Sequence, residues 1–325
     1  MGTTMHRQTL VALLVLVVCL HPAIAASAEE DKQPPPIEWI YLRASALDMT
    51  AKLGARKGRA EHLARGTLAP VFKTTEKDGV KWAQVRILNL ATTRPQVGWV
   101  ESDHADVLPP DSYPSDAELL GRLGTPYVDD FTAKHTDVAR FLVRKGPGAP
   151  LLLCYVFARP LPTAKLVVFT PSQGRFLPGA SLDFPISEMQ AGIIALEIRD
   201  LLGDANECLI SREPFRERPE TRGLNLIIRR IEGDKFRIVW QAPVEFRNLA
   251  EFRSQVQILQ PPEKNIGAPG TTTTGEVTFR QRANQQDPIW KGKVEFFLFG
   301  REKAVDSVTI ERVCPWDGKE FTPLR

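Results

Sequence analysis

The stretch IALEIRDLLGDANECLI, residues 194–210, indicates the fold class of the chain. From Ile194 to Ile198 apolar residues alternate with polar or small ones, which is the period-two pattern of a half-buried strand. Gly203 and the Asp and Asn residues around it supply a turn, because Gly tolerates positive φ and short polar side chains hydrogen-bond the backbone ahead of them. An apolar run begins again at Cys208. The stretch therefore predicts a strand, an acidic turn and a second strand.

Short runs of the same kind continue through the second half of the chain. Gly or Pro interrupts nearly every gap between them, and no long segment keeps the 3.6-residue period of an amphipathic helix. Strands are expected at residues 139–143, 151–157, 165–169, 193–198, 208–210, 224–231, 236–240, 276–279, 294–299 and 308–313. The sequence therefore predicts an all-β fold with a large β-rich domain, residues 127–325, built as a sandwich or a partial propeller.

The N-terminus predicts export. Arg7 precedes the apolar run from Thr9 to Leu20, and a small-residue site, Ala23-Ile24-Ala25, follows. These are the parts of a secretory signal peptide, residues 1–25. The apolar run is shorter than the roughly 20 residues of a membrane span. We therefore expect a periplasmic or secreted protein with no membrane span after cleavage, beginning with a disordered leader, residues 26–36.

Composition narrows the class of protein. A chain of 325 residues is long enough for about two domains, and its 43% hydrophobic residues can fill a sizeable core. Charged residues make up 25% of the chain, and the formal net charge is +3. Both signs are interspersed, so the concentrated basic face that a nucleic-acid partner requires is not expected.

Residues 37–108 carry a different pattern, in which four short strands precede a proline-rich segment. Asp78-Gly79 lies between the second and third of these strands, and such a pair favours a tight hairpin turn. Strands of this length joined by hairpins predict a small barrel. The residues that mark it are Leu42-Arg43, Gly66, Asp78-Gly79, Trp82 with Val85-Arg86, and Gly98-Trp99-Val100.

In their order these residues resemble the bacterial SH3-like domain. The resemblance implies an SH3-like barrel over residues 37–108 that recognises a wall peptide or another envelope partner. Trp82, Trp99 and Tyr41 are the candidate ligand-binding residues. Packing in the core is the alternative for the tryptophans, because Trp dominates the packing of so small a domain. The basic loop after Arg43 departs from the family pattern, so the binding residues of the family are not carried over.

Residues 109–126 are expected to form a linker between the two domains. Pro109-Pro110 opens it, and a short amphipathic segment from Ala117 to Leu123 follows Ser115. Gly124 and Pro126 end that segment, because neither residue continues a helix.

The acidic turn at residues 200–206 is a candidate calcium site. Asp200, Asp204 and Asn206 offer oxygen ligands, which a hard cation prefers. The segment around residues 193–210 also resembles the FG-GAP-type propeller repeat, whose acidic loop binds metal. Leu202 and Cys208, however, occupy places where that family has carboxylates. A tight turn satisfied by its own side chains is therefore the favoured alternative, and calcium is the one candidate cofactor.

Three cysteines follow the signal peptide: Cys154, Cys208 and Cys314. Cys154 lies in an apolar strand, where it is expected to pack as a small buried hydrophobe. If one pair forms a disulfide in an oxidising compartment, Cys208 with Cys314 is the expected pair. No paired histidine spacing of a metalloenzyme and no nucleophile-elbow motif is found in the sequence, so a catalytic role is not expected.

These observations predict an exported, non-catalytic binding protein of the cell envelope. Its expected partner is an envelope polymer such as peptidoglycan, or an envelope protein. Two alternatives stay open. One is a wall-active or carbohydrate-active enzyme whose catalytic residues have no linear motif, and the other is a structural subunit of an envelope complex.

Overall fold

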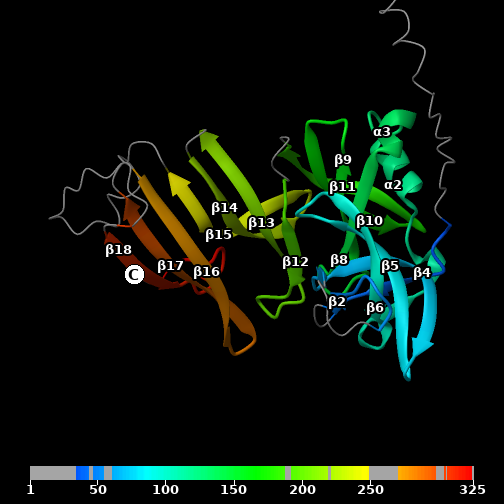
Figure 1. Ribbon diagram of the computed structural model, residues 1–325, viewed down its shortest axis with the longest axis horizontal. Helices are drawn as coiled ribbons and strands as arrows, with labels where there is room; N and C mark the ends of the chain where they lie inside the picture. The colour runs from blue at the N-terminus through cyan, green and yellow to red at the C-terminus, as the bar shows by residue number, and fades with distance from the viewer. Residues whose placement is uncertain are drawn as a thin grey trace, which may run out of the picture. The chain divides into compact units, whose positions relative to one another are not determined.

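The computed structural model describes residues 34–43, 47–54, 61–186, 192–218, 221–248, 270–297, 304 and 306–323. From Pro36 onward the chain forms one compact unit. Its described residues are dominated by antiparallel strands, which confirms the predicted all-β fold (Figure 1). None of the helices in this part of the chain is long and apolar enough to cross a membrane.

Two large sheets contain most of the strands. The first sheet has the order β11-β10-β9-β8-β4-β1-β7, with β5 also paired to β4 and β6 paired to β5. The strands of this sheet are β1 (Glu38–Tyr41), β4 (Thr67–Lys77), β5 (Val80–Asn89), β6 (Arg94–Glu101), β7 (Asp106–Leu108), β8 (Thr136–Val143), β9 (Leu151–Ala158), β10 (Thr163–Ser172) and β11 (Arg175–Pro185). Two short strands, β2 (Leu47–Met49) and β3 (Glu61–Leu63), pair with each other.

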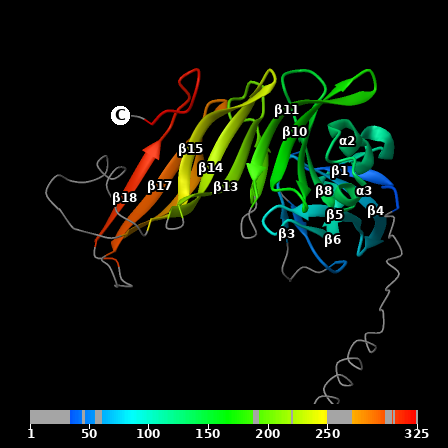
Figure 2. The ribbon, with the colours of Figure 1, turned by 90° about the horizontal axis from the view of Figure 1, so that it is seen from above.

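The second sheet is a consecutive run from β12 to β18, in which each strand pairs with the next one along the chain (Figure 2). Its strands are β12 (Ala195–Arg199), β13 (Cys208–Arg218), β14 (Thr221–Glu232), β15 (Lys235–Asn248), β16 (Gly270–Arg282), β17 (Gln285–Phe297) and β18 (Asp306–Val313). The stretch at residues 194–210 forms the hairpin of β12 and β13, with Leu196 opposite Ser211. The predicted strand, turn and strand are thus confirmed.

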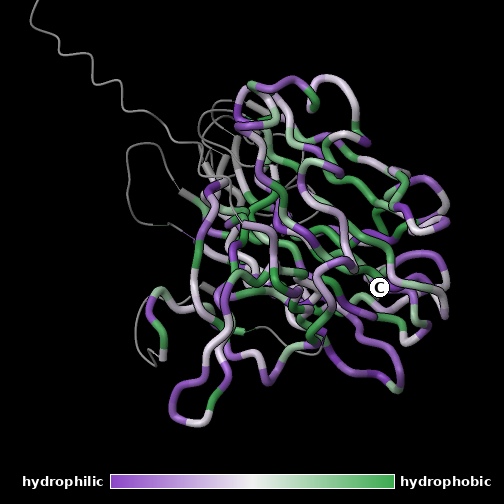
Figure 3. The backbone as a smooth tube through the Cα atoms, turned by 90° about the vertical axis from the view of Figure 1, so that its right-hand side faces the viewer, coloured by the Kyte–Doolittle hydropathy of each residue, from purple (hydrophilic) through white to green (hydrophobic). Residues whose placement is uncertain are grey.

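A shared hydrophobic core joins the two sheets. Leu153 and Tyr155 of β9 are fully buried in it, and so are Ile198 of β12 and Leu209 of β13. Because one cluster takes side chains from both sheets, neither sheet buries its apolar face alone. Figure 3 shows hydrophobic positions along the strands in the interior and hydrophilic ones along many of the hairpin loops.

The opposite face of the first sheet is covered by helix α2 (Asp116–Leu123), with α3 (Asp130–Lys134) after it. Helix α2 begins at a capping box, in which Ser115 and Glu118 satisfy each other's backbone N–H groups. Leu119 and Leu120 are buried against the sheet. The amphipathic segment predicted at residues 117–123 is confirmed, and residues 109–126 also contain the 3-10 turn η2 (Pro110–Ser112).

Residues 37–108 have a small hydrophobic core of their own, which includes Ile40, Val71 and Val85. All four expected strands are present, and the Asp78-Gly79 turn has φ values of 55° and 75°, as a tight hairpin requires. None of the sheets in the described residues closes into a barrel, however. The expected SH3-like barrel is therefore corrected to an open arrangement, in which a single bridge, Thr50 to Trp99, connects the segment after β2 to β6.

Strand β11 is present in the structure but absent from the predicted strands. Its sequence contains Pro178, Gly179 and Pro185, which are residues that argue against an interior strand. In the structure β11 lies at the end of the sheet order. One edge of β11 pairs with no strand of the first sheet. A proline whose missing N–H would point to that edge removes no hydrogen bond of the sheet.

A buried ion pair lies on the face of the second sheet that contributes to the shared core. Arg229 forms a bidentate contact with Glu213, with one Nη2 to Oε2 distance of 2.9 Å, and also donates to Ser211 Oγ at 3.0 Å. Arg229 is 5% exposed and Glu213 is 8% exposed. Arg229 is the register partner of Leu209, so it lies on the same face as the shared core.

We predict that Glu213→Leu lowers the free energy of unfolding by about 3–5 kcal/mol, because it leaves a buried guanidinium without its carboxylate. The double variant Glu213→Leu/Arg229→Met should recover most of that loss, since it removes both charges. Urea denaturation followed by circular dichroism measures both values. A loss below about 1 kcal/mol for the single variant would contradict the buried pair.

Candidate functional site

The candidate site lies where strand β4 divides its second edge between two partners. Its first edge is occupied by β1 over residues 68–71. On the second edge, Leu68 pairs with Arg140 of β8, whereas Val71 pairs with Val85 of β5. One strand edge cannot hold two neighbours at the same position, so β5 and β8 separate there. We call this place the fork.

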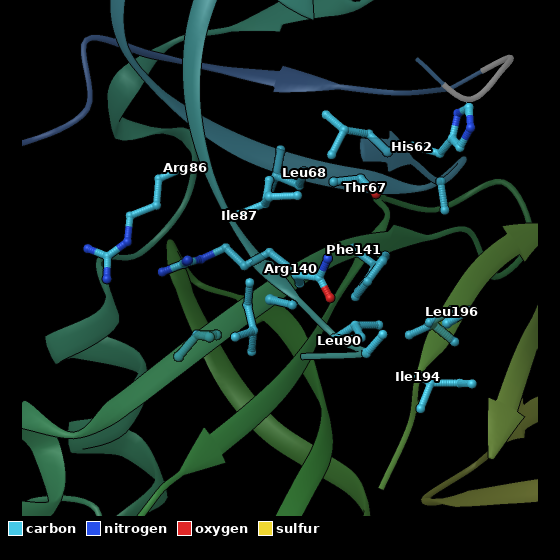
Figure 4. Close-up of a pocket in the computed structure, with 18 of the residues that line it drawn as sticks. His62, Thr67, Leu68, Arg86, Ile87, Leu90, Arg140, Phe141, Ile194 and Leu196 are labelled. Atoms are coloured by element: carbon cyan, nitrogen blue, oxygen red, sulfur yellow. The ribbon is translucent and has the colours of Figure 1, made fainter. Parts of the chain in front are cut away.

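A pocket of about 200 Å³ occupies the fork. Most of its wall is apolar, and Figure 4 shows Leu68, Ile87 and Phe141 around it. The second sheet completes the wall with Ile194 and Leu196. Side chains from both sheets therefore line one small cavity, which we call the fork pocket.

At the fork pocket, one edge of strand β8 has no partner strand among the described residues. The N–H of Leu142 points to β4, because it donates to the carbonyl of Gly66 at 2.9 Å. The β8 to β9 register has no bulge, so alternate residues from Leu142 back to Val138 and Thr136 direct their backbone groups to the same side. Arg140 pairs with Leu68, but no strand in the described residues pairs with that edge at Val138. Val138 lines the pocket.

The other strand at the fork also diverges from β4. Strand β5 pairs with β4 up to Val85, and its following residues, from Arg86 to Asn89, pair only with β6 in the described part of the chain. At the junction itself β4 has Pro70, which lines the pocket and has no N–H to satisfy. The fork is thus a place where strand pairing ends on both sides of a cavity.

Charged groups surround one end of the fork pocket. Arg86 Nη2 lies 3.3 Å from Asp137 Oδ1, and Arg159 Nη2 lies 2.5 Å from Asp137 Oδ2. Arg140 forms an ion pair with Asp116 and is only 5% exposed. Of these groups Arg86 and Arg140 line the pocket itself, and each is in an ion pair with a carboxylate.

Arg140 has a further property that bears on ligand binding. Its guanidinium lies 5.1 Å from the ring centroid of Trp39, and one of its nitrogens bonds Asp116. Its Nε, however, is buried without a hydrogen-bond partner. A buried donor without an acceptor is costly, and Arg140 lines the fork pocket. An acceptor brought by a ligand would satisfy it.

The three aromatic residues expected to bind ligand do not gather at this pocket. Trp82 and Tyr41 are each 6% exposed, so they present little surface, and burial raises the pKa of the Tyr41 phenol. Trp99 is partly exposed, and its backbone forms both hydrogen bonds of the bridge to Thr50, at 2.8 and 2.9 Å. Trp82 therefore packs in the interior, which is the alternative stated for the tryptophans.

The acidic turn is held by its own hydrogen bonds. Asp200 accepts the backbone N–H groups of Leu202, Gly203 and Ala205 at 3.2, 2.8 and 3.2 Å. Asp204 accepts from the backbone of Asn206 at 3.0 Å and from Arg230 at 2.8 Å.

For Asp204, burial acts to raise the pKa, but the hydrogen bonds from Asn206 and the charge of Arg230 hold it below its ordinary value. Within the described residues no group of three His, Cys, Asp or Glu side chains could hold a metal ion. The carboxylate oxygens of Asp200 and Asp204 are thus engaged in turn and ion-pair contacts, and Asn206 takes part in the turn as a donor, through its backbone N–H and its Nδ2.

The three cysteines of the described residues are buried free thiols. The expected Cys208–Cys314 disulfide is therefore absent, and that expectation is corrected. Cys208 and Cys314 have different hydrogen-bond partners: the backbone of Leu201 bonds the Cys208 thiol, and the indole of Trp240 bonds the Cys314 thiol. Burial raises the pKa of Cys154 and of Cys208 to about 12, which keeps both thiols protonated and poorly nucleophilic near neutral pH.

Sequence reasoning missed the residues that form the fork pocket. Arg86 was noted as part of a motif, but nothing local in the sequence indicates that Val138 lacks a strand partner. Pro70 is the one available signal, because a proline inside a predicted strand often marks the end of pairing.

A search of the chain against models of protein families, curated proteins and solved structures gives no match.

We predict that Asp200→Ala lowers the free energy of unfolding by about 1–3 kcal/mol, because three backbone N–H groups lose a charged acceptor. The loss in free energy of unfolding should be the same in about 1 mM calcium and in a chelator, because the hydrogen bonds within the turn stabilise it without metal. Thermal melting in both solutions measures this. A calcium-dependent rise of several degrees that disappears in Asp200→Ala would instead assign a metal site to the turn.

Proposed function

We propose that this chain is an exported, non-catalytic protein of the cell envelope that binds an extended polypeptide segment at the fork pocket. One observation carries the proposal: the edge of β8 at Val138, which no strand of the described residues pairs with, lies beside an apolar cavity. Exposed sheet edges bind extended peptides by strand addition, in which backbone hydrogen bonds give affinity and a side-chain pocket gives specificity.

The size of the cavity supports this kind of ligand. Sites for whole small molecules measure roughly 300–1,000 Å³, and the fork pocket is about 200 Å³. It therefore suits one apolar side chain of a longer segment. Leu68, Phe141 and Leu196 would contact that side chain, while the backbone of the segment pairs with Val138.

The charges at the pocket restrict the partner further. The arginines that line the pocket, Arg86 and Arg140, favour a segment that places a hydrogen-bond acceptor next to its apolar residue. The free Nε of Arg140 is the donor that such a group, or a backbone carbonyl, would satisfy. The pocket is lined mostly by apolar side chains, and its two arginines, Arg86 and Arg140, are paired with carboxylates, which supports binding as its role. His62, its one histidine, lies 2.5 Å from Asp48 at the exposed rim.

Export supports an envelope location for the partner. The signal peptide expected at residues 1–25 lies outside the described residues, so the proposal takes it from the sequence alone. The partner would then be an envelope protein that offers an extended segment, or the peptide part of a wall polymer.

We predict that Val138→Pro weakens peptide binding by roughly fivefold to tenfold, because it removes the N–H that the peptide backbone would bond, and one backbone hydrogen bond is worth about 0.5–1.5 kcal/mol. Val138→Ala, the matched control, keeps that N–H and should retain binding. Random 12-residue peptides displayed on phage are first selected on the mature chain. Fluorescence polarisation then gives their affinities for each variant.

A second variant fills the pocket. Ala195 is an exposed residue of its wall, so Ala195→Trp should fold normally and exclude the bound side chain. Selected peptides should bind this variant weakly as well. Equal affinities for wild type, Val138→Pro and Ala195→Trp, with unchanged melting temperatures, would place the peptides elsewhere and reject the proposal.

A further inference from the structure

A second cavity, of about 440 Å³, lies between the end of α2 with its following loop and the strands β10 and β11. The strand register places its floor residues on one face of the sheet. Lys165 is opposite Asp183, and Val167 is opposite Ser181. Thr163 lies two residues before Lys165 and so shares this face. The floor therefore combines two hydroxyl groups, an ammonium group and a carboxylate.

The walls of this cavity are mostly apolar. Leu123, Pro126, Leu161 and Pro162 line it, and Tyr127 adds a phenol. Tyr127 is 5% exposed. Burial, and then the charge of Asp183, raise the pKa of this phenol, so at neutral pH its hydroxyl is protonated and can donate a hydrogen bond.

The charges of the floor are matched. Lys165 Nζ lies 2.6 Å from Asp183 Oδ1, and their side chains are 24% and 57% exposed. Arg122, at the rim, donates to the carbonyl of Phe176 at 2.9 Å. An exposed ion pair of this kind contributes little to stability. It does place a strong donor and a strong acceptor side by side at the cavity.

We propose that this cavity binds a neutral sugar, either free or as part of a glycan. A sugar hydroxyl both donates and accepts hydrogen bonds, so two adjacent hydroxyls can bond the carboxylate of Asp183 and the ammonium of Lys165 together. The hydroxyls of Ser181 and Thr163 extend this network. The apolar C–H faces of a sugar ring would contact Leu123 and the proline rings.

The size and charge of the cavity select this ligand class. A volume of about 440 Å³ is within the range of roughly 300–1,000 Å³ for small-molecule sites. The ion pair of the floor neutralises itself, and the one further charged side chain of the lining, Arg122, lies at the rim and is engaged by the carbonyl of Phe176. This site shares no residue with the fork pocket, and the inference stands whether or not that pocket binds peptides.

Titration of the mature chain with three neutral tetrasaccharides, chitotetraose, cellotetraose and maltotetraose, tests the inference by isothermal calorimetry. At least one should bind with a Kd of about 1 mM or below. Asp183→Ala removes the acceptor, and Ser181→Trp fills the cavity. Both residues are exposed, so both variants should keep the wild-type melting temperature while affinity falls by about tenfold or more.

Arg175→Trp is the matched control, because Arg175 lies on the same strand but does not line the cavity. It should bind the sugar as wild type does. The inference is overturned if none of the three sugars binds at about 10 mM, or if Asp183→Ala and Ser181→Trp bind as tightly as wild type. Because peptide binding and sugar binding are measured in separate assays, the data can reject one proposal and leave the other in place.

Discussion

A strand has only two hydrogen-bonding edges, and the architecture of this protein depends on how β4 uses its edges. One edge pairs with β1, and the other is divided between β8, at Leu68, and β5, beginning at Val71. This division joins residues 37–108 to the rest of the first sheet through backbone hydrogen bonds. It also prevents closure into a barrel, because β5 leaves β4 where β8 joins it. The fork pocket is the space that this separation leaves.

The second sheet supplies the rest of the wall of the fork pocket and part of the shared core. Its strands β12 and β13 contribute Ile198 and Leu209 to the shared core, and Leu196 to both that core and the fork pocket. On the same face of this sheet, the buried pair of Arg229 and Glu213 is stable only with both partners present. The wall of the pocket therefore depends on contacts between the sheets, and a change that loosens the core should also alter the pocket.

Local patterns in the sequence predict much of the fold, and long-range pairing accounts for most of what they miss. Alternating runs mark the strands, and Asp78-Gly79 marks its hairpin, because both depend on neighbours in the chain. Strand β11 was missed because Pro178 and Gly179 are tolerated at an edge that no local pattern reveals. The open edge at Val138 depends on which strands pair with β4, and the local sequence of β8 does not indicate that pairing. Asp200 could be assigned to a turn but not excluded as a ligand, since the same carboxylate serves either role.

Residue-resolved amide hydrogen exchange tests the fork most directly. Leu142 and Val138 lie on one strand and direct their N–H groups to the same side, but within the described residues only Leu142 has a strand partner there, donating to the carbonyl of Gly66. We expect the Val138 amide to exchange at least about tenfold faster than that of Leu142, and a bound peptide to slow it. Equal protection of the two amides in the free protein would show that the β8 edge is paired, and would contradict the account.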